Sequence, residues 1–263
     1  MKTKAFYPHG LRKLGAEFLR RSPLLLVLDF DGTLAPIAPT PEAAKMPPAV
    51  RGALKRILRR RDARVAVLSG RALPDASRKV SLPGVVIAGS HGMDSSDRRL
   101  CWSGRKVRAW KRAAREAARR LKPLLKGWKG ARLELKGPDL SLHFRLARPS
   151  VTVRRLPEAV HLVRGLPLSP RGGKCVLEFR PSRAPGKGEA LARLARFLAP
   201  GWRKTGLCVY IGDDVTDEDA FRMLRKLGRH VLGLRVGPGP SRAHFHLRDE
   251  REILRFLASF RTG

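Results

Sequence analysis

The chain has 263 residues, which is long enough for one large domain or for a core domain with a smaller insertion. Its three cysteines lie far apart and form no CxxC pair, which disfavours a zinc site and a disulfide-bridged secreted scaffold, so we expect a cytoplasmic protein. Lysine and arginine outnumber acids by 56 to 22, which gives a net charge of +34. Such a charge attracts nucleic acid and small phosphorylated molecules alike. The basic residues are spread over the whole chain, which favours a general bias in composition over a dedicated nucleic-acid surface.

The first part of the chain predicts a parallel sheet. Short apolar runs at 24–28, 64–68 and 85–88 are typical of buried strands, and a helical pattern near 48–60 separates the first two. Strands that alternate with helices in this way form βαβ units. The run at 24–28 is too short for a signal peptide or a membrane span, and no other stretch reaches membrane length, so we expect no membrane association.

The pattern changes near residue 97. Up to Pro123, apolar residues at spacings of three and four predict a basic helix. Alternating apolar and polar residues then predict two antiparallel strands around a turn at 137–139. We expect an apolar face with Leu133, Leu135, Leu140, Leu142, Phe144 and Leu146, and a polar face with Glu134, Lys136, Ser141, His143 and Arg145.

A helix near 152–164 and a strand at 174–180 complete a small α+β unit. This strand continues the alternation, with Lys174, Glu178 and Arg180 on one face. The polar face is either the solvated side of a half-buried sheet or a binding surface, and the alternation alone favours the solvated side.

From residue 186 onward the strand–helix rhythm returns. The predicted elements are a helix at 189–198, a strand at 207–211 and a helix at 217–227. The sequence therefore predicts an α/β core domain at 1–96 and 183–263, with a parallel sheet flanked by helices, and an inserted α+β domain at 97–182.

Two acids follow the first buried strand directly. In LLLVLDFDGT, Asp29 and Asp31 lie two residues apart, just past the apolar run at 24–28. Ligands of an open parallel sheet bind beyond the carboxyl ends of its strands. Because carboxylates this close repel each other, the pair indicates a site that needs a cation.

A second acidic cluster follows the predicted strand at 207–211. Five of the seven residues 213–219 are acids, in a chain that has only 22. Hard oxygen ligands of this kind suit Mg²⁺. Asp217 stands at the head of a predicted helix, so a plain helix N-cap is the alternative for this residue. Two such clusters in a chain poor in acids indicate one functional site.

Two further segments could contact phosphate. Ser69, Gly70 and Arg71 follow the second predicted strand, where a hydroxyl and a guanidinium can donate hydrogen bonds to phosphate oxygens. Lys187 lies between two glycines at the start of a helix, where its ammonium could meet an anion. For Lys187 the alternative is a flexible loop with a solvated side chain, and each segment alone is weak evidence.

Taken in order, these segments resemble the four motifs of the haloacid dehalogenase superfamily. A narrower resemblance is to the trehalose-phosphatase family, and it extends from about residue 24 to residue 221. It implies a Rossmann-like core with an inserted cap domain. The motifs that carry it are DFDGTLAPI at 29–37, LSGR at 68–71, GSHG at 89–92, Lys187 and GDDVTDEDAF at 212–221.

The resemblance implies a role for each core residue. Asp29 would be the nucleophile that forms an aspartyl-phosphate, and Asp31 would protonate the leaving sugar oxygen and then activate water. Mg²⁺ would be held by Asp29, by Asp213 and by the backbone carbonyl of Asp31. The expected phosphate or substrate contacts are Ser69, Gly70, Arg71 and Lys187. Asp214 or Asp217 would orient Lys187 or the water molecules bound to the metal.

The resemblance extends to the inserted domain. In the family this cap closes over the sugar, and HFR at 143–145 and EFRP at 178–181 resemble family cap segments. The residues that we expect to contact substrate are therefore His143, Arg145 and Glu178. His91 either binds substrate or holds the turn at 89–92, and we favour binding.

The implied partner is a small sugar phosphate, with trehalose 6-phosphate favoured, and we expect a monomer. Two alternatives stay open. A related phosphatase that acts on sucrose phosphate or glucosyl-glycerate phosphate would share the core motifs, because cap residues set the sugar. A protein that binds nucleic acid or an anionic surface would explain the charge, but the intact Asp29 and Asp31 argue against it.

Overall fold

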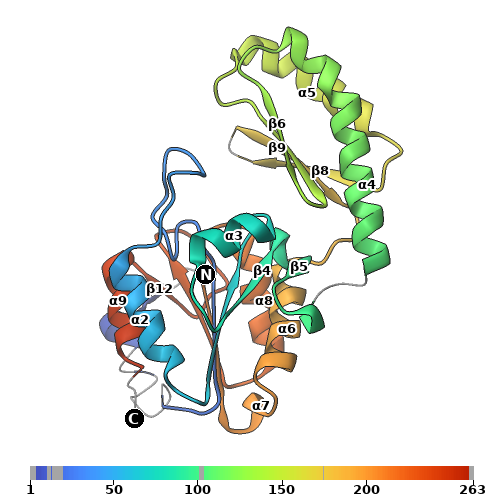
Figure 1. The fold of residues 1–263 in the computed structure, drawn as a ribbon. Coiled ribbons are helices and arrows are strands. Elements are labelled where there is room, and N and C mark those ends of the chain that lie inside the picture. Colours follow the sequence, from blue (N-terminus) through green and yellow to red (C-terminus); the bar gives the residue numbers. More distant parts are fainter. Residues whose placement is uncertain (1–3, 11–12, 14–19, 101–103, 174, 261–263) are drawn as a thin grey trace. The chain divides into compact units, whose positions relative to one another are not determined.

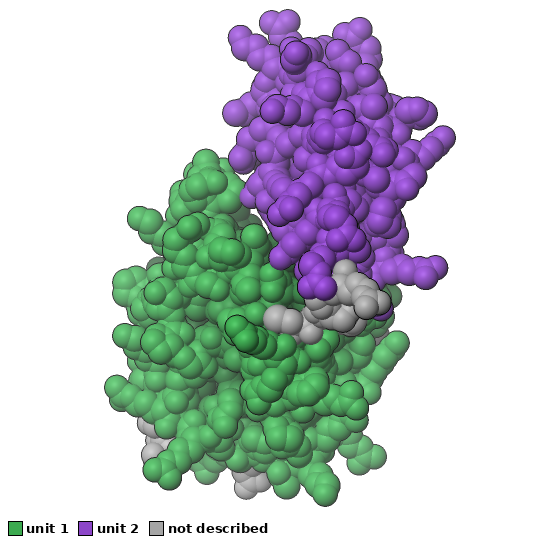
Figure 2. Space-filling view, turned by 45° about the vertical axis from the view of Figure 1, so that its right-hand side comes forward, with its two compact units in different colours: residues 1–101, 185–263 green, residues 102–184 purple. Residues whose placement is uncertain are grey.

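The computed structural model describes residues 4–10, 13, 20–100, 104–173 and 175–260. The chain divides into two compact units (Figure 2). Unit 1 consists of residues 1–101 and 185–263, and unit 2 of residues 102–184.

Unit 1 is built on an eight-stranded sheet with the spatial order β1-β12-β11-β10-β2-β3-β4-β5. Neighbouring strands are parallel, except that β5 runs antiparallel to β4. This mostly parallel sheet confirms the predicted fold class of the core. Its strands are β1 (Lys4–Ala5), β2 (Leu24–Leu28), β3 (Ala63–Leu68), β4 (Val85–Gly89), β5 (Asp94–Ser95), β10 (Leu207–Gly212), β11 (Val231–Val236) and β12 (Phe245–Leu247).

Helices cover both faces of this sheet (Figure 1). On one side lie α2 (Pro48–Leu58), α3 (Leu73–Val80) and α9 (Glu250–Ala258); on the other lie α6 (Lys187–Leu198), α7 (Trp202–Thr205) and α8 (Asp217–Leu227). Alternate residues of β2 pack into the two separate cores, with Leu26 in the first and Val27 in the second. Because both faces are buried, the strand is apolar at every position.

Unit 2 combines a four-stranded antiparallel sheet with two helices that pack on one of its faces. Their shared core contains Trp128, Leu140, Leu142 and Phe179. This second sheet confirms the predicted α+β character of the insertion. Its elements are α4 (Gly104–Leu121), β6 (Arg132–Lys136), β7 (Asp139–His143), α5 (Pro149–Val163), β8 (Leu168–Gly173) and β9 (Val176–Pro181). Among the described residues of both units, the short helical segments are η1 (Phe6–Gly10), η2 (Ser90–Gly92), η3 (Arg98–Leu100) and η4 (Lys122–Gly127).

The predicted strand, whose alternation continued to Leu146, is longer than the observed β7. The strand ends earlier, and Leu146 is 85% exposed. The backbone N–H of Ala147 donates to the carbonyl of Phe144 at 3.0 Å and closes a turn that leads into α5. Arg145 therefore lies in an exposed turn and not on the polar face of the sheet.

The β6–β7 hairpin turn is shorter than predicted. Lys136 and Asp139 already pair in the ladder, so only two residues connect the strands, and Gly137 has the positive φ of +66° that such a tight turn requires. Asp139 thus belongs to the sheet. Lys174, expected on the polar face, lies outside the described residues. No helix in the described part of the chain is both long and apolar enough to cross a membrane.

Candidate active site

The predicted core residues follow neighbouring strands of the unit 1 sheet. Because β10, β2 and β3 lie side by side and run parallel, the segments that follow them meet at one edge. These segments carry Asp213, Asp29 and Ser69. The backbone N–H of Asp29 donates to the carbonyl of Ile211 at 2.9 Å, which holds the two acidic segments together.

Lys187 is the cation of a buried cluster. Its Nζ donates to Oδ1 of Asp29 at 2.9 Å and to Oδ1 of Asp217 at 2.6 Å. The lysine is buried, so the alternative of a solvated side chain is wrong. The glycine before it allows a close approach of α8, because a Cβ on Gly186 would lie 2.2 Å from Oδ2 of Asp219.

Asp217 accepts hydrogen bonds at both carboxylate oxygens. Besides Lys187, Oδ1 accepts from the hydroxyl of Tyr210, and Oδ2 accepts from the backbone N–H groups of Asp213 at 3.0 Å and Asp214 at 2.9 Å. The N-cap of α8 is Thr216, so the plain N-cap alternative for Asp217 is wrong. Tyr210 was not predicted, because a tyrosine inside an apolar strand gives no sign of its hydrogen-bond partner.

A third carboxylate, Asp213, lies beside the two that Lys187 contacts. Oxygens of Asp29, Asp213 and Asp217 lie within 4.8 Å of one another. Burial and the charge of Asp217 raise the pKa of Asp213 to about 6, and burial raises the pKa of Asp29 well above its ordinary value. Burial acts to lower the pKa of Lys187, but the carboxylates Asp217 and Asp29 outweigh it and raise that pKa.

This excess of negative charge fits a bound Mg²⁺, which prefers carboxylate oxygens. Both oxygens of Asp217 are already engaged by donors of this chain, so Asp29 and Asp213 are the members of the cluster left to hold an ion. Gly32 lets Asp213 approach the first acidic segment. It has a φ of +81°, and a Cβ there would lie 2.1 Å from Oδ2 of Asp213.

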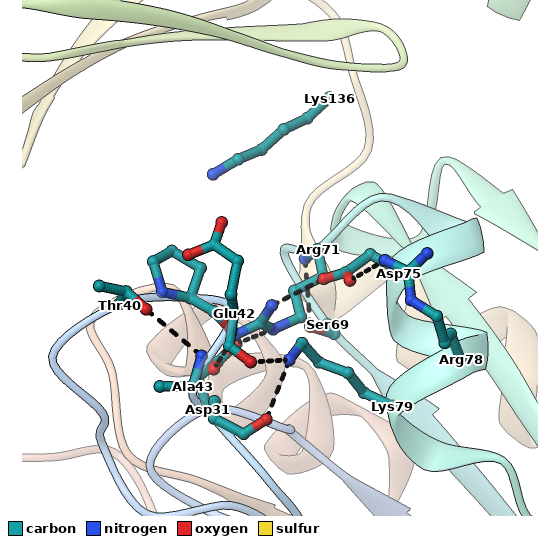
Figure 3. Close-up of polar contacts among 12 residues, drawn as sticks. Asp31, Thr40, Glu42, Ala43, Ser69, Arg71, Asp75, Arg78, Lys79 and Lys136 are labelled. Atoms are coloured by element: carbon teal, nitrogen blue, oxygen red, sulfur yellow. Dashed lines mark hydrogen bonds and ion pairs between the residues drawn. The ribbon is translucent and has the colours of Figure 1, made fainter.

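Arg71 contacts carboxylates of its own chain (Figure 3). Its Nε and Nη2 donate to the two carboxylate oxygens of Asp31 at 2.7 and 2.6 Å, and its Nη1 donates to Oδ2 of Asp75 at 2.6 Å. Asp75 was not predicted, although its spacing of four residues from Arg71 at the head of a helix is one at which ion pairs form. The backbone N–H of Arg71 donates to Oγ of Ser69 at 3.1 Å, so this hydroxyl oxygen shapes the turn after β3.

The remaining predicted core residues lie around the cluster. Asp214 is exposed, and Oδ2 of its carboxylate accepts from the Thr216 hydroxyl at 3.4 Å. His91 is buried with a left-handed φ of +56°, and its imidazole packs against the backbone of Gly70, where a Cβ would lie 2.9 Å from the ring. The backbone N–H of His91 donates to the carbonyl of Ser69 at 2.8 Å, so His91 supports the turn after β3.

A family model described as "Trehalose-phosphatase" matches residues 27–250, which include every site residue predicted from the sequence. The chain belongs to the trehalose-phosphatase family. It is 34% identical over 250 residues to "Trehalose 6-phosphate phosphatase RA3" of Zea mays, covering 89% of this chain and 68% of that protein. It is also 34% identical over 215 residues to "Probable trehalose-phosphate phosphatase" of Sinorhizobium fredii, and this match covers 81% of this chain and 77% of that protein.

The solved structure of the C. albicans trehalose-6-phosphate phosphatase C-terminal domain shares the fold. It matches with a TM-score of 0.77 at 20% identity and covers 98% of each chain. Structural neighbours of the chain include phosphatases of the haloacid dehalogenase superfamily.

In this trehalose-phosphatase family member, the predicted residues of the insertion lie in unit 2. A hydrogen bond of 2.7 Å joins Nε2 of His143 to Oε2 of Glu134. Glu178 pairs with Ser141 in the ladder, so both lie on the polar face of the sheet. Asp139, which was not predicted as a site residue, is buried on the same face, and this burial raises its pKa to about 7.

Proposed function

We propose that the protein is a Mg²⁺-dependent phosphatase that hydrolyses trehalose 6-phosphate to trehalose and phosphate through an aspartyl-phosphate on Asp29. The buried cluster of one lysine and three carboxylates at the carboxyl edge of the sheet carries this proposal, in a chain whose relatives are named trehalose-phosphate phosphatases. We further propose a cytoplasmic monomer, for which a nucleic-acid partner is possible but not favoured.

Asp29, Asp213 and the backbone carbonyl of Asp31 are the groups that would hold Mg²⁺. The bound ion would offset the repulsion between the anionic nucleophile and the anionic phosphate. Support comes from the raised pKa of Asp213: burial and the charge of Asp217 favour its neutral form, and a bound cation would favour the charged form.

The chain's own residues account for both steps of the reaction. An oxygen of Asp29 forms a bond to phosphorus while the bond to the sugar oxygen breaks, and Asp31 gives that oxygen a proton. Asp31 then takes a proton from the water that hydrolyses the aspartyl-phosphate. An ammonium has three N–H donors, and Lys187 uses two of them on Asp29 and Asp217, which leaves one for a phosphoryl oxygen. Ser69 would donate to the same phosphoryl group.

The polar face of the unit 2 sheet is our proposed binding surface for the sugar, through His143 and Glu178, with Arg145 in the adjoining turn. Two buried oxygens on this face support the proposal. Within the described part of the chain, Oδ1 of Asp139 and Oγ of Ser141 have no hydrogen-bond partner, and Nε of Arg180 pairs with this Oδ1 only at 3.8 Å. Buried polar atoms are rarely left in this state, and sugar hydroxyls would satisfy them.

A phosphate-release assay across sugar phosphates, with Mg²⁺ and with EDTA, tests the proposal. We expect release from trehalose 6-phosphate that requires Mg²⁺ and that is lost in Asp29→Asn, while the circular dichroism spectrum of this variant stays unchanged. Faster release from sucrose phosphate or glucosyl-glycerate phosphate would correct the substrate. No release from any substrate, together with salt-sensitive binding to a random DNA duplex, would favour the nucleic-acid alternative.

A further inference from the structure

The guanidinium of Arg71 is almost fully used by partners in its own chain. Besides the paired contacts with Asp31 and the contact with Asp75, Nη2 donates to the carbonyl of Pro41 at 2.8 Å. A guanidinium has five N–H donors, so these four contacts leave one, on Nη1. The side chain is also only 10% exposed. This geometry is poorly suited to the phosphate contact that was predicted from the sequence.

Further contacts hold the side of Arg71 that faces away from Asp31 (Figure 3). Asp75 lies in the first turn of α3 and also accepts from Nη2 of Arg78 at 2.8 Å. Lys79 of the same helix donates to the carbonyls of Glu42 and Ala44, each at 2.9 Å. These contacts tie the segment after Thr40 to α3, so the guanidinium is held from two directions.

Asp31 is more exposed than Arg71, which it contacts, and than Asp75, the other carboxylate that Arg71 contacts. Its side chain is 44% exposed, whereas the side chain of Asp75 is 30% exposed. An exposed aspartate would otherwise sample several rotamers. The paired contact with Arg71 fixes the plane of the carboxylate as well as its distance, because both oxygens bind the same planar group.

We infer that Arg71 is a positioning residue that acts through Asp31 rather than a phosphate ligand. The inference rests on the proposed function, in which Asp31 gives a proton to the leaving sugar oxygen. Arg71 itself gains and loses no proton. It sets the direction from which the Asp31 carboxyl group reaches the leaving oxygen, and proton transfer is sensitive to such geometry.

The leaving group distinguishes positioning from phosphate binding. A sugar alkoxide needs a proton in order to leave, whereas p-nitrophenolate leaves without one. We therefore expect Arg71→Met to lower kcat/KM about 100-fold for trehalose 6-phosphate and by less than about 5-fold for p-nitrophenyl phosphate. Arg71→Lys should resemble Arg71→Met, because one ammonium cannot reproduce the paired contact. The matched control is Arg64→Met, which removes a guanidinium outside this network that donates to the carbonyls of Arg61 and Ala63, and it should change neither value.

A double-mutant cycle completes the test. Asp31→Asn should still transfer phosphate to Asp29 from p-nitrophenyl phosphate, which appears as a burst of p-nitrophenol. If Arg71 acts through Asp31, adding Arg71→Met to this variant changes the burst rate by less than about 2-fold. If Arg71→Met does not fold, Asp75→Asn takes its place, because it loosens the guanidinium without removing it. This variant should lower kcat/KM for trehalose 6-phosphate more than for p-nitrophenyl phosphate, but by a smaller factor than Arg71→Met.

Equal losses on both substrates, or a further loss in the double variant, would overturn this inference and return Arg71 to the phosphate site. Failure of the proposed function looks different, since the wild-type protein would then release phosphate from neither substrate. That result would overturn the positioning role as well, because Arg71 would have no proton transfer to serve.

Discussion

Asp217→Asn tests whether a single carboxylate holds the buried site together. All four groups that contact this side chain are donors, namely the ammonium of Lys187, the hydroxyl of Tyr210 and two backbone N–H groups. An amide offers one oxygen and one NH₂ group, so in either orientation its NH₂ group faces two donors. The substitution changes few atoms but removes half of the acceptors.

Two lost hydrogen bonds to a charged acceptor cost about 1.5–3 kcal/mol each, or about 3–6 kcal/mol together. Part of this loss is offset, because repulsion with Asp29 and Asp213 is relieved. We therefore expect a net loss of about 3 kcal/mol in the free energy of unfolding, which corresponds to a fall in Tm of about 6–12 °C for a unit of this size.

Thermal unfolding followed by circular dichroism measures this fall, with Asp219→Asn as the matched control. Asp219 lies in the same helix and is 41% exposed, and it accepts from the backbone N–H of Gly188 at 2.9 Å. We expect its Tm to change by less than about 2 °C. A fall in Asp217→Asn no larger than that in the control would refute the claim that Asp217 is the central acceptor of the site.

Three further predictions concern the metal, pH and the sugar. Gly32→Ala should raise the Mg²⁺ concentration needed for half-maximal activity at least about tenfold, because its Cβ would displace Asp213, whereas Gly237→Ala, with a similar φ of +80° and open space around it, should not. In EDTA, the free energy of unfolding should fall as pH rises from about 4 to about 7, because native Asp139, with its pKa of about 7, and Asp213, with its pKa of about 6, keep protons that the unfolded chain loses near the ordinary value of 3.8. Urea unfolding of Asp139→Asn should therefore show a shallower slope than the wild-type protein. Glu178→Ala should raise KM for trehalose 6-phosphate more than for p-nitrophenyl phosphate, and equal increases would argue against sugar binding by unit 2.

The sequence by itself determined the core strands and the edge on which the site is built. A strand buried on both faces is apolar at every position, so the run at 24–28 coincides with β2 residue for residue. Parallel strands place the residues after them at one edge, so the acids that follow β2 and β10 could be expected to meet. Both inferences use short stretches of chain and general rules of sheet geometry.

Partner choice among the polar side chains was decided only by the tertiary structure. Arg71 and Asp31 lie 40 residues apart, and both were expected at the site, yet nothing in their spacing shows that they bind each other. Tyr210 stands in an apolar strand, and its contact with Asp217 depends on how α8 packs on β10. Hydrogen bonds require donor and acceptor within about 3 Å of each other, and distances of that order between separate segments are fixed by packing rather than by local pattern.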